Sequence, residues 1–228
     1  MTAVSRDILT GLSEQHLLKR SDGFMLHKDV AEPFIALCEA AKAAGIELKI
    51  VSAFRSYQRQ SAIWQAKFSG NRAVYHQDGH LVDISSLTGK AKLDAILLYS
   101  ALPGASRHHW GTDLDVYDAA AVAADYKPQL EPAEYQHDGP FYRLYQWLCR
   151  NAADFGFFLP YREYQGGVAA EPWHLSYRPV AQQYQAQMTP ILLKHCIERH
   201  PIAGQSLVLQ HLDSIVSQYV NNICDAAQ

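Results

Sequence analysis

The sequence predicts an α+β protein in which a small antiparallel sheet is flanked by helices. Two observations lead to this fold class. Apolar residues recur at helical spacing over most of the 228-residue chain, and only three short segments alternate between apolar and polar residues as strands do. Few strands among many helices are typical of one sheet covered by helices. The composition, 48% hydrophobic and 19% charged, is that of an ordinary globular chain.

Five segments have the apolar spacing of helices. They are residues 29–44, 57–68, 92–102, 141–156 and 206–220. The first four end at or next to residues that break helices, namely Gly45, Gly70, Pro103 and Gly156. Because the pattern stays helical after Pro179, we expect the chain to finish in helices.

The three strand-like segments are residues 46–54, 112–116 and 173–177. Side chains of a strand alternate between its two faces. The second segment should therefore place Asp113 and Asp115 on the face opposite to Leu114. Two polar or proline-containing stretches, 71–90 and 119–139, are expected to be loops.

Composition and charge exclude several classes of protein. A formal net charge of -3 gives no reason to expect a nucleic-acid partner. No run of about 18 apolar residues is present, so no membrane-spanning helix is expected. The first 18 residues lack a basic start followed by an apolar run, which predicts no secretory signal peptide and a cytoplasmic location. The four cysteines are far apart, so they are expected to be free thiols. No feature of the sequence indicates an oligomeric state.

Two short segments carry residues suited to hold a metal ion. His108 and Asp115 are seven positions apart across a turn at Gly111, so a loop histidine and a strand aspartate can face one ion. His174 opens the last strand-like segment, three residues after Glu171. Imidazole nitrogens and carboxylate oxygens are ordinary zinc ligands. We therefore predict one Zn²⁺ ion held by His108, Asp115 and His174. The neighbouring His109 is the alternative to the first of these ligands.

Glu171 indicates the reaction expected at such a site. A catalytic zinc ion keeps one position open for water and lowers the pKa of that water toward ~7. A carboxylate that does not bind the metal then takes the proton during attack and passes it to the leaving amine. We predict that Glu171 is this base.

These segments resemble the LAS metallopeptidases, and within them the VanY-like D-alanyl-D-alanine carboxypeptidases. The family pattern Ser-x-His-x-x-Gly-x-Ala-x-Asp is matched by Ser106, His108, Gly111 and Asp115. The pattern Glu-x-Trp-His is matched by Glu171, Trp173 and His174. An upstream aromatic-Arg-Ser segment followed by glutamine is matched by Phe54, Arg55, Ser56 and Gln60. The chain departs from the first pattern at Asp113, which stands where the family usually has alanine.

The resemblance implies a LAS/hedgehog-like metallopeptidase fold in a single domain, 1–228. Its catalytic core would cover about residues 25–180, followed by a helical C-terminal extension over about 181–228. Arg55 would be catalytic, because a fixed cation can stabilise the charge that develops on the carbonyl oxygen. Contacts with the substrate would come from Ser106, Gln60, Trp173 and Ser56.

The function implied is a zinc carboxypeptidase that removes the terminal D-alanine from a peptidoglycan-derived peptide. The motifs leave open whether it cleaves the D-Ala-D-Ala bond, the L,D bond of a tetrapeptide, or a free dipeptide. One alternative is a wall-lytic endopeptidase of the endolysin type, which the lack of a visible wall-binding repeat disfavours. Another is a non-catalytic binding module that retains zinc. Glu171 and Arg55 argue against that module, because binding alone requires neither.

Overall fold

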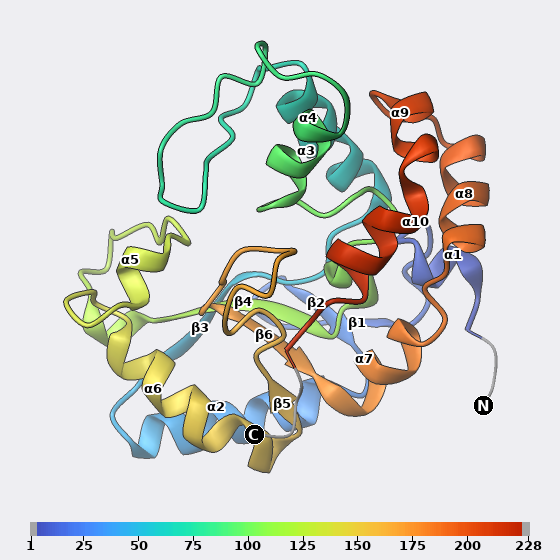
Figure 1. The fold of residues 1–228 in the computed structure, drawn as a ribbon. Helices are drawn as coiled ribbons and strands as arrows, with labels where there is room; N and C mark the ends of the chain where they lie inside the picture. The colour runs from blue at the N-terminus through green and yellow to red at the C-terminus, as the bar shows by residue number, and fades with distance from the viewer. Residues whose placement is uncertain (1–3, 225–228) are drawn as a thin grey trace.

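A four-stranded antiparallel sheet forms the centre of the protein, whose computed structural model describes residues 4–224 (Figure 1). The strand order is β3-β4-β6-β5. The bounds of these strands are Leu48–Ser52 for β3, Asp113–Asp118 for β4, Phe157–Phe158 for β5 and His174–Tyr177 for β6. A separate two-stranded hairpin pairs β1 (Leu17–Lys19) with β2 (Met25–His27).

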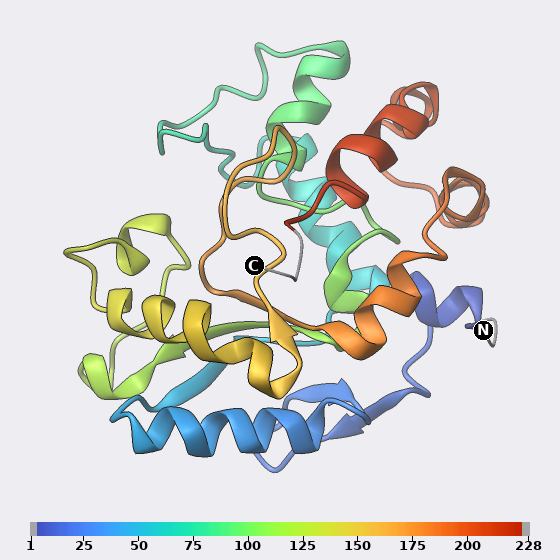
Figure 2. The same ribbon diagram turned by 60° about the horizontal axis from the view of Figure 1, so that its bottom comes forward.

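Helices cover both sides of the sheet. The α-helices are α1 (Arg6–Leu9), α2 (Ala31–Ala43), α3 (Tyr57–Phe68), α4 (Gly89–Leu97), α5 (Pro132–Tyr135), α6 (Tyr142–Asn151), α7 (Arg178–Gln185), α8 (Pro190–Arg199), α9 (Gln205–Gln210) and α10 (Leu212–Ile215). Short turns of other helix types are η1 (Arg107–Trp110), η2 (Ala119–Ala121), η3 (Ala152–Phe155) and η4 (Val216–Val220). In both views α2 and α6 lie on one side of the sheet, whereas α3, α4 and α8 to α10 lie on the other (Figures 1 and 2). The predicted α+β class is confirmed.

The alternation of β4 and β6 separates an apolar face from a polar face. Leu114, Val116 and Leu175 are buried in the core that α2 and α6 complete. The intervening residues of both strands are polar and lie on the opposite face; they are Asp113, Asp115, His174 and Ser176. A second core on the other side of the molecule is shared by α3, α4 and α7 to α10. The helices after about residue 181 therefore pack against the rest of the chain through a common core.

Gly111 places η1 against the β1-β2 hairpin. It ends η1 with a φ of 66°, in the left-handed region that glycine adopts readily. A Cβ atom here would lie 2.7 Å from the backbone nitrogen of His27. Only glycine therefore allows this close approach, which sets the position of the preceding residues of η1.

Several elements differ from the sequence prediction, and three of these differences have a clear physical reason. The helix expected over 92–102 is shorter, because the Leu98 carbonyl accepts from the Ala169 N–H instead of continuing the helix. The helix expected over 206–220 breaks at His211, whose φ is -110°. The loop expected over 119–139 contains α5, which begins with a capping box formed by Glu131 and Glu134. No helix of residues 4–224 has the length and apolar character to cross a membrane.

Candidate active site

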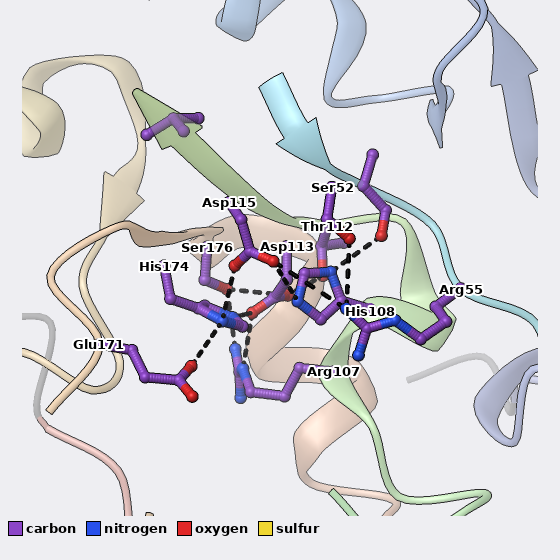
Figure 3. Close-up of polar contacts among 12 residues, drawn as sticks. Ser52, Arg55, Arg107, His108, Thr112, Asp113, Asp115, Glu171, His174 and Ser176 are labelled. Atoms are coloured by element: carbon purple, nitrogen blue, oxygen red, sulfur yellow. Dashed lines mark hydrogen bonds and ion pairs between the residues drawn. The ribbon is translucent and has the colours of Figure 1, made fainter. Parts of the chain in front are cut away.

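The structure brings the three predicted zinc ligands together. His108 lies in η1, Asp115 lies on β4, and His174 begins β6, where it is the direct cross-strand partner of Asp115. Potential ligand atoms of the three residues all lie within 4.8 Å of one another. The Nε2 atom of His108 is 3.4 Å from Asp115 Oδ2, and Nδ1 of His174 is 3.4 Å from Asp115 Oδ1. Figure 3 shows these side chains converging from their separate elements.

Each histidine turns one nitrogen toward the cluster and uses the other to fix its ring. The Nδ1 atom of His108 is 2.8 Å from the Ala53 carbonyl oxygen, to which it must donate. The Nε2 atom of His174 is 2.9 Å from Asp113 Oδ1, which accepts in the same way. When such a ring is neutral, this contact leaves the other nitrogen, Nε2 of His108 or Nδ1 of His174, with a lone pair directed at the cluster. Oriented histidines of this kind are typical of metal sites.

Buried polar atoms without partners show that the cluster fits a metal ion. Asp115 Oδ1 and His174 Nδ1 are both buried and have no hydrogen-bond partner among residues 4–224, which is costly unless a ligand satisfies them. Burial lowers the pKa of His174, but the hydrogen bond to Asp113 and the carboxylates of Glu171 and Asp115 outweigh this and raise it to about 9. The site therefore favours positive charge beside His174, and a divalent cation supplies it. Two imidazoles and one carboxylate are a ligand set that zinc accepts.

His109 is not part of this cluster. Its ring is fully buried, with Nδ1 2.6 Å from the Arg55 carbonyl oxygen and Nε2 accepting from the Gly104 N–H at 3.1 Å. Burial lowers its pKa to about 3, so the ring stays neutral. Because both nitrogens have backbone partners, His109 joins two segments of the fold, and His108 is the residue of the pair that faces Asp115.

Glu171 lies beside the cluster but outside it. Its Oε2 atom is 3.3 Å from His174 Nδ1, and its side chain keeps 14% of its surface exposed. The turn before β6 holds it in place, since its N–H donates to the Tyr161 carbonyl and its carbonyl accepts from the His174 N–H. A partly exposed carboxylate next to the predicted metal ligands is suited to exchange protons with water.

Arg55 approaches the cluster from the loop between β3 and α3. Its Nη2 atom is 4.0 Å from Asp115 Oδ2 and donates to Ser52 Oγ at 3.2 Å. Its Nη1 atom donates to Gln60 Oε1 at 3.0 Å. These contacts hold the guanidinium at the edge of the predicted metal site.

The predicted substrate contacts divide into two groups. Ser106 and Trp173 line the cleft that contains the metal ligands. Gln60 does not reach it: the side chain is completely buried, with its amide between Arg55 and the Ala101 carbonyl. Ser56 is the N-cap of α3, where its hydroxyl accepts from the Arg59 N–H. Gln60 therefore supports Arg55, and Ser56 begins a helix.

Asp113 is the acceptor that orients His174, and it has a charged partner of its own. Arg107 Nε donates to Asp113 Oδ1 at 2.8 Å, while the Thr112 and Ser176 hydroxyls donate to Oδ2 at 2.6 and 3.1 Å. Burial raises the pKa of Asp113, but Arg107 and His174 outweigh it and hold that pKa well below its usual range. Sequence reasoning missed Arg107. The predicted position of Asp113 could have indicated such a residue, because a carboxylate on the inner face of a strand needs a buried cation.

The cleft around the cluster has a volume of about 680 Å³. It is lined by the end of α3 and the loop after it, by η1, by residues 129–133 and by the segment before β6. Sequence reasoning also missed two lining residues, Lys67 and Tyr161. The ring of Tyr161 packs edge-on against His174 at a centroid distance of 5.0 Å.

Comparisons with solved structures define the class to which this fold belongs. A VanYB structure in complex with D-alanine-D-alanine superposes with a TM-score of 0.51 at 23% identity, over 79% of this chain and 87% of that one. A mutant VanY D,D-pentapeptidase from a VanB-type resistance cassette, in complex with Zn(II), gives a TM-score of 0.51 at 23% identity over 75% and 86% of the two chains. The fold is thus that of the VanY peptidases.

The sequence itself matches the family described as "VanY: D-alanyl-D-alanine carboxypeptidase" over residues 23–180. The chain belongs to this family, which confirms the resemblance seen in its motifs. Helices α8 to α10 lie beyond the matched segment.

Three relatives show how far the sequence similarity extends. An uncharacterised Haemophilus influenzae protein is 37% identical over 121 residues, covering 52% of this chain and 92% of that protein. The putative carboxypeptidase YodJ of Bacillus subtilis is 27% identical, over 67% of this chain and 46% of its own length. A D-alanyl-D-alanine carboxypeptidase of Enterococcus faecalis is 27% identical, over 62% of this chain and 44% of its own length. The chain spans less than half the length of the last two.

Proposed function

We propose that this protein is a zinc-dependent carboxypeptidase that removes the terminal D-alanine from peptidoglycan stem peptides. The observation that carries the proposal is the convergence of His108, Asp115 and His174, each with an atom free for a metal, beside the separate carboxylate of Glu171. Membership of the family supports the peptidase activity, and the D-alanine-D-alanine complex of VanYB supports the class of substrate.

Different residues of the cleft have different roles in amide hydrolysis. A bound zinc ion would supply the Lewis acidity that lowers the pKa of water toward ~7. Glu171 takes a proton from the attacking water and returns it to the nitrogen of the leaving D-alanine. Arg55 stabilises the negative charge that develops on the carbonyl oxygen, since Gln60 and Ser52 hold its guanidinium beside the metal ligands.

Replacing Arg55 by alanine tests this assignment. We expect kcat to fall by roughly 10²–10³, the usual cost of losing one stabilising donor, while the zinc content stays unchanged. Steady-state kinetics on a peptide ending in D-Ala-D-Ala and metal analysis of the same sample measure both. Arg59→Ala, an exposed position of α3, is the matched control. A normal kcat for Arg55→Ala would remove the residue from the mechanism.

Asp113→Asn tests the orienting contact to His174. We expect the affinity for zinc to fall by roughly 10- to 100-fold, as is usual when the partner of a metal-bound histidine is lost. Competition with a chromogenic chelator measures this affinity without any assay of activity. Asp118→Asn is the control, because Asp118 is also buried and lies on β4 at the end away from the site. Equal losses in both variants would mean that the strand is simply destabilised.

Mass spectrometry of three incubations tests the proposed activity and identifies the bond. The zinc-loaded protein is incubated with a stem pentapeptide, a stem tetrapeptide and free D-Ala-D-Ala. Shortening of the pentapeptide by one D-alanine identifies a DD-carboxypeptidase, and shortening of the tetrapeptide identifies an LD-carboxypeptidase. Cleavage of the free dipeptide identifies a dipeptidase. No reaction with any of them would contradict the proposal and favour the zinc-retaining binding module.

A further inference from the structure

Lys67 is a buried cation on the wall of the active-site cleft. It lies near the end of α3, two helical turns after Gln60, and only 8% of the residue is exposed, yet it lines the cleft. Among residues 4–224, no carboxylate lies within ion-pair distance of its ammonium group, and no hydrogen bond to that group is present. Buried lysines are usually paired, so this one is exceptional.

The surroundings of Lys67 disfavour its charge. Burial lowers its pKa and the charge of Arg72 lowers it further; the attraction of Glu171 and the weaker repulsion by Arg55 do not reverse this, so the pKa falls to about 8. The side chain is still mostly protonated at pH 7. An ammonium group that keeps only a small contact with the cleft and has no counter-ion is poorly solvated, which is costly. An anion that enters the cleft would remove this cost.

Arg72 adds a second positive charge on the same wall. It lies in the loop after α3, its side chain is exposed, and it also lines the cleft. Its backbone N–H donates to the Ala66 carbonyl at 3.0 Å, which ties the loop to the end of the helix. Two other arginines line the cleft but have protein partners, since Arg55 contacts Gln60 and Arg107 contacts Asp113.

We propose that Lys67 and Arg72 form a subsite that binds a carboxylate of the peptide substrate. The inference rests on the proposed carboxypeptidase function and names the chemistry by which the cleft selects its substrate. The carboxylate has two possible sources in a peptide, the terminal D-alanine and an acidic side chain upstream of it. Either carboxylate would bring one negative charge to the ammonium group of Lys67, which lacks a partner.

The test compares two peptides and three variants at pH 7. In N-acetyl-Lys-D-Ala-D-Ala the terminal carboxylate is the only one, whereas N-acetyl-Glu-D-Ala-D-Ala carries an additional side-chain carboxylate. Lys67→Met removes the charge, Lys67→Arg retains it, and Lys194→Met makes the same change at an exposed position of α8. Steady-state kinetics give KM and kcat, and calorimetry gives the binding of each peptide whether or not it is cleaved.

We expect Lys67→Met to raise KM, and to weaken binding, by about 10- to 100-fold, with little change in kcat. The melting temperature should stay level or rise, because an unpaired buried charge is lost. Lys67→Arg should recover much of the affinity, and Lys194→Met should behave as wild type.

The pattern over the two peptides identifies the carboxylate. Equal losses with both peptides assign the subsite to the terminal carboxylate, and a loss confined to the glutamyl peptide assigns it to the side chain. Unchanged KM and binding for both peptides, or a drop in melting temperature that Lys67→Arg also shows, would overturn the subsite while leaving the carboxypeptidase intact. If the wild type binds the peptides without cleaving them, the proposed function fails, and the calorimetric comparison still decides on the subsite.

Discussion

Glu171→Ala is expected to keep its zinc and lose hydrolysis. Glu171 lies 3.3 Å from His174 but outside the group of ligand atoms, so its removal leaves the metal site complete. General-base catalysis contributes roughly 10²–10⁴ to the rate, and a loss of this size in kcat is therefore expected. Kinetics and the zinc content of the same sample measure the two effects separately.

Glu163→Ala is the matched control, since Glu163 is an exposed acid in the same segment between β5 and β6. It should hydrolyse peptides normally. Turnover by Glu171→Ala close to that of this control would show that another group takes the proton from water.

His174→Ala is expected to lose the metal ion altogether. The variant removes one of the three predicted ligands. It also removes the imidazole nitrogen that lies beside Asp115 Oδ1. His108→Ala should have the same result, because Nε2 of His108 lies against the other oxygen of that carboxylate. Metal analysis after dialysis against a weak chelator should give stoichiometric zinc in the wild type and almost none in these variants.

His76→Ala provides the comparison for both histidine variants. His76 lines the same cleft but lies in the loop before α4, away from the ligand atoms. It should retain one zinc ion per chain. Full occupancy in either His108→Ala or His174→Ala would eliminate that residue as a ligand.

The convergence of His108, Asp115 and His174 could be predicted from the sequence because local patterns determine their positions. The alternation of β4 places Asp115 opposite the apolar core, and the glycine at 111 ends η1 directly before the strand. Pairing of β4 with β6 then sets Asp115 against His174. The helix α3 was predicted with its observed bounds, since its apolar spacing and the glycine at position 70 are both local signals; its cap at Ser56 was not recognised.

The remaining features depend on tertiary contacts that no local pattern encodes. The partnership of Asp113 with Arg107 joins two elements whose relative position follows only from the complete fold. Gln60 lies five positions after Arg55 and was predicted as a substrate contact, but its side chain is buried against Arg55 and the Ala101 carbonyl instead of lining the cleft. Lys67 carries no local signal in the sequence, because its burial on the cleft wall appears only in the folded chain. The strands β1, β2 and β5 are two or three residues long, too short for an alternating pattern to be recognised.

A zinc titration of metal-free protein tests whether one zinc ion held by His108, Asp115 and His174 enables hydrolysis at a terminal D-alanine. The metal is removed with a chelator, zinc is returned in steps, and the D-alanine released from a peptide ending in D-Ala-D-Ala is measured at each step. We expect no activity without metal, a linear return of activity as zinc is added, and a plateau at one zinc ion per chain. Hydrolysis by the metal-free protein, or a return of activity in His174→Ala at the same ratio of zinc to protein, would contradict it.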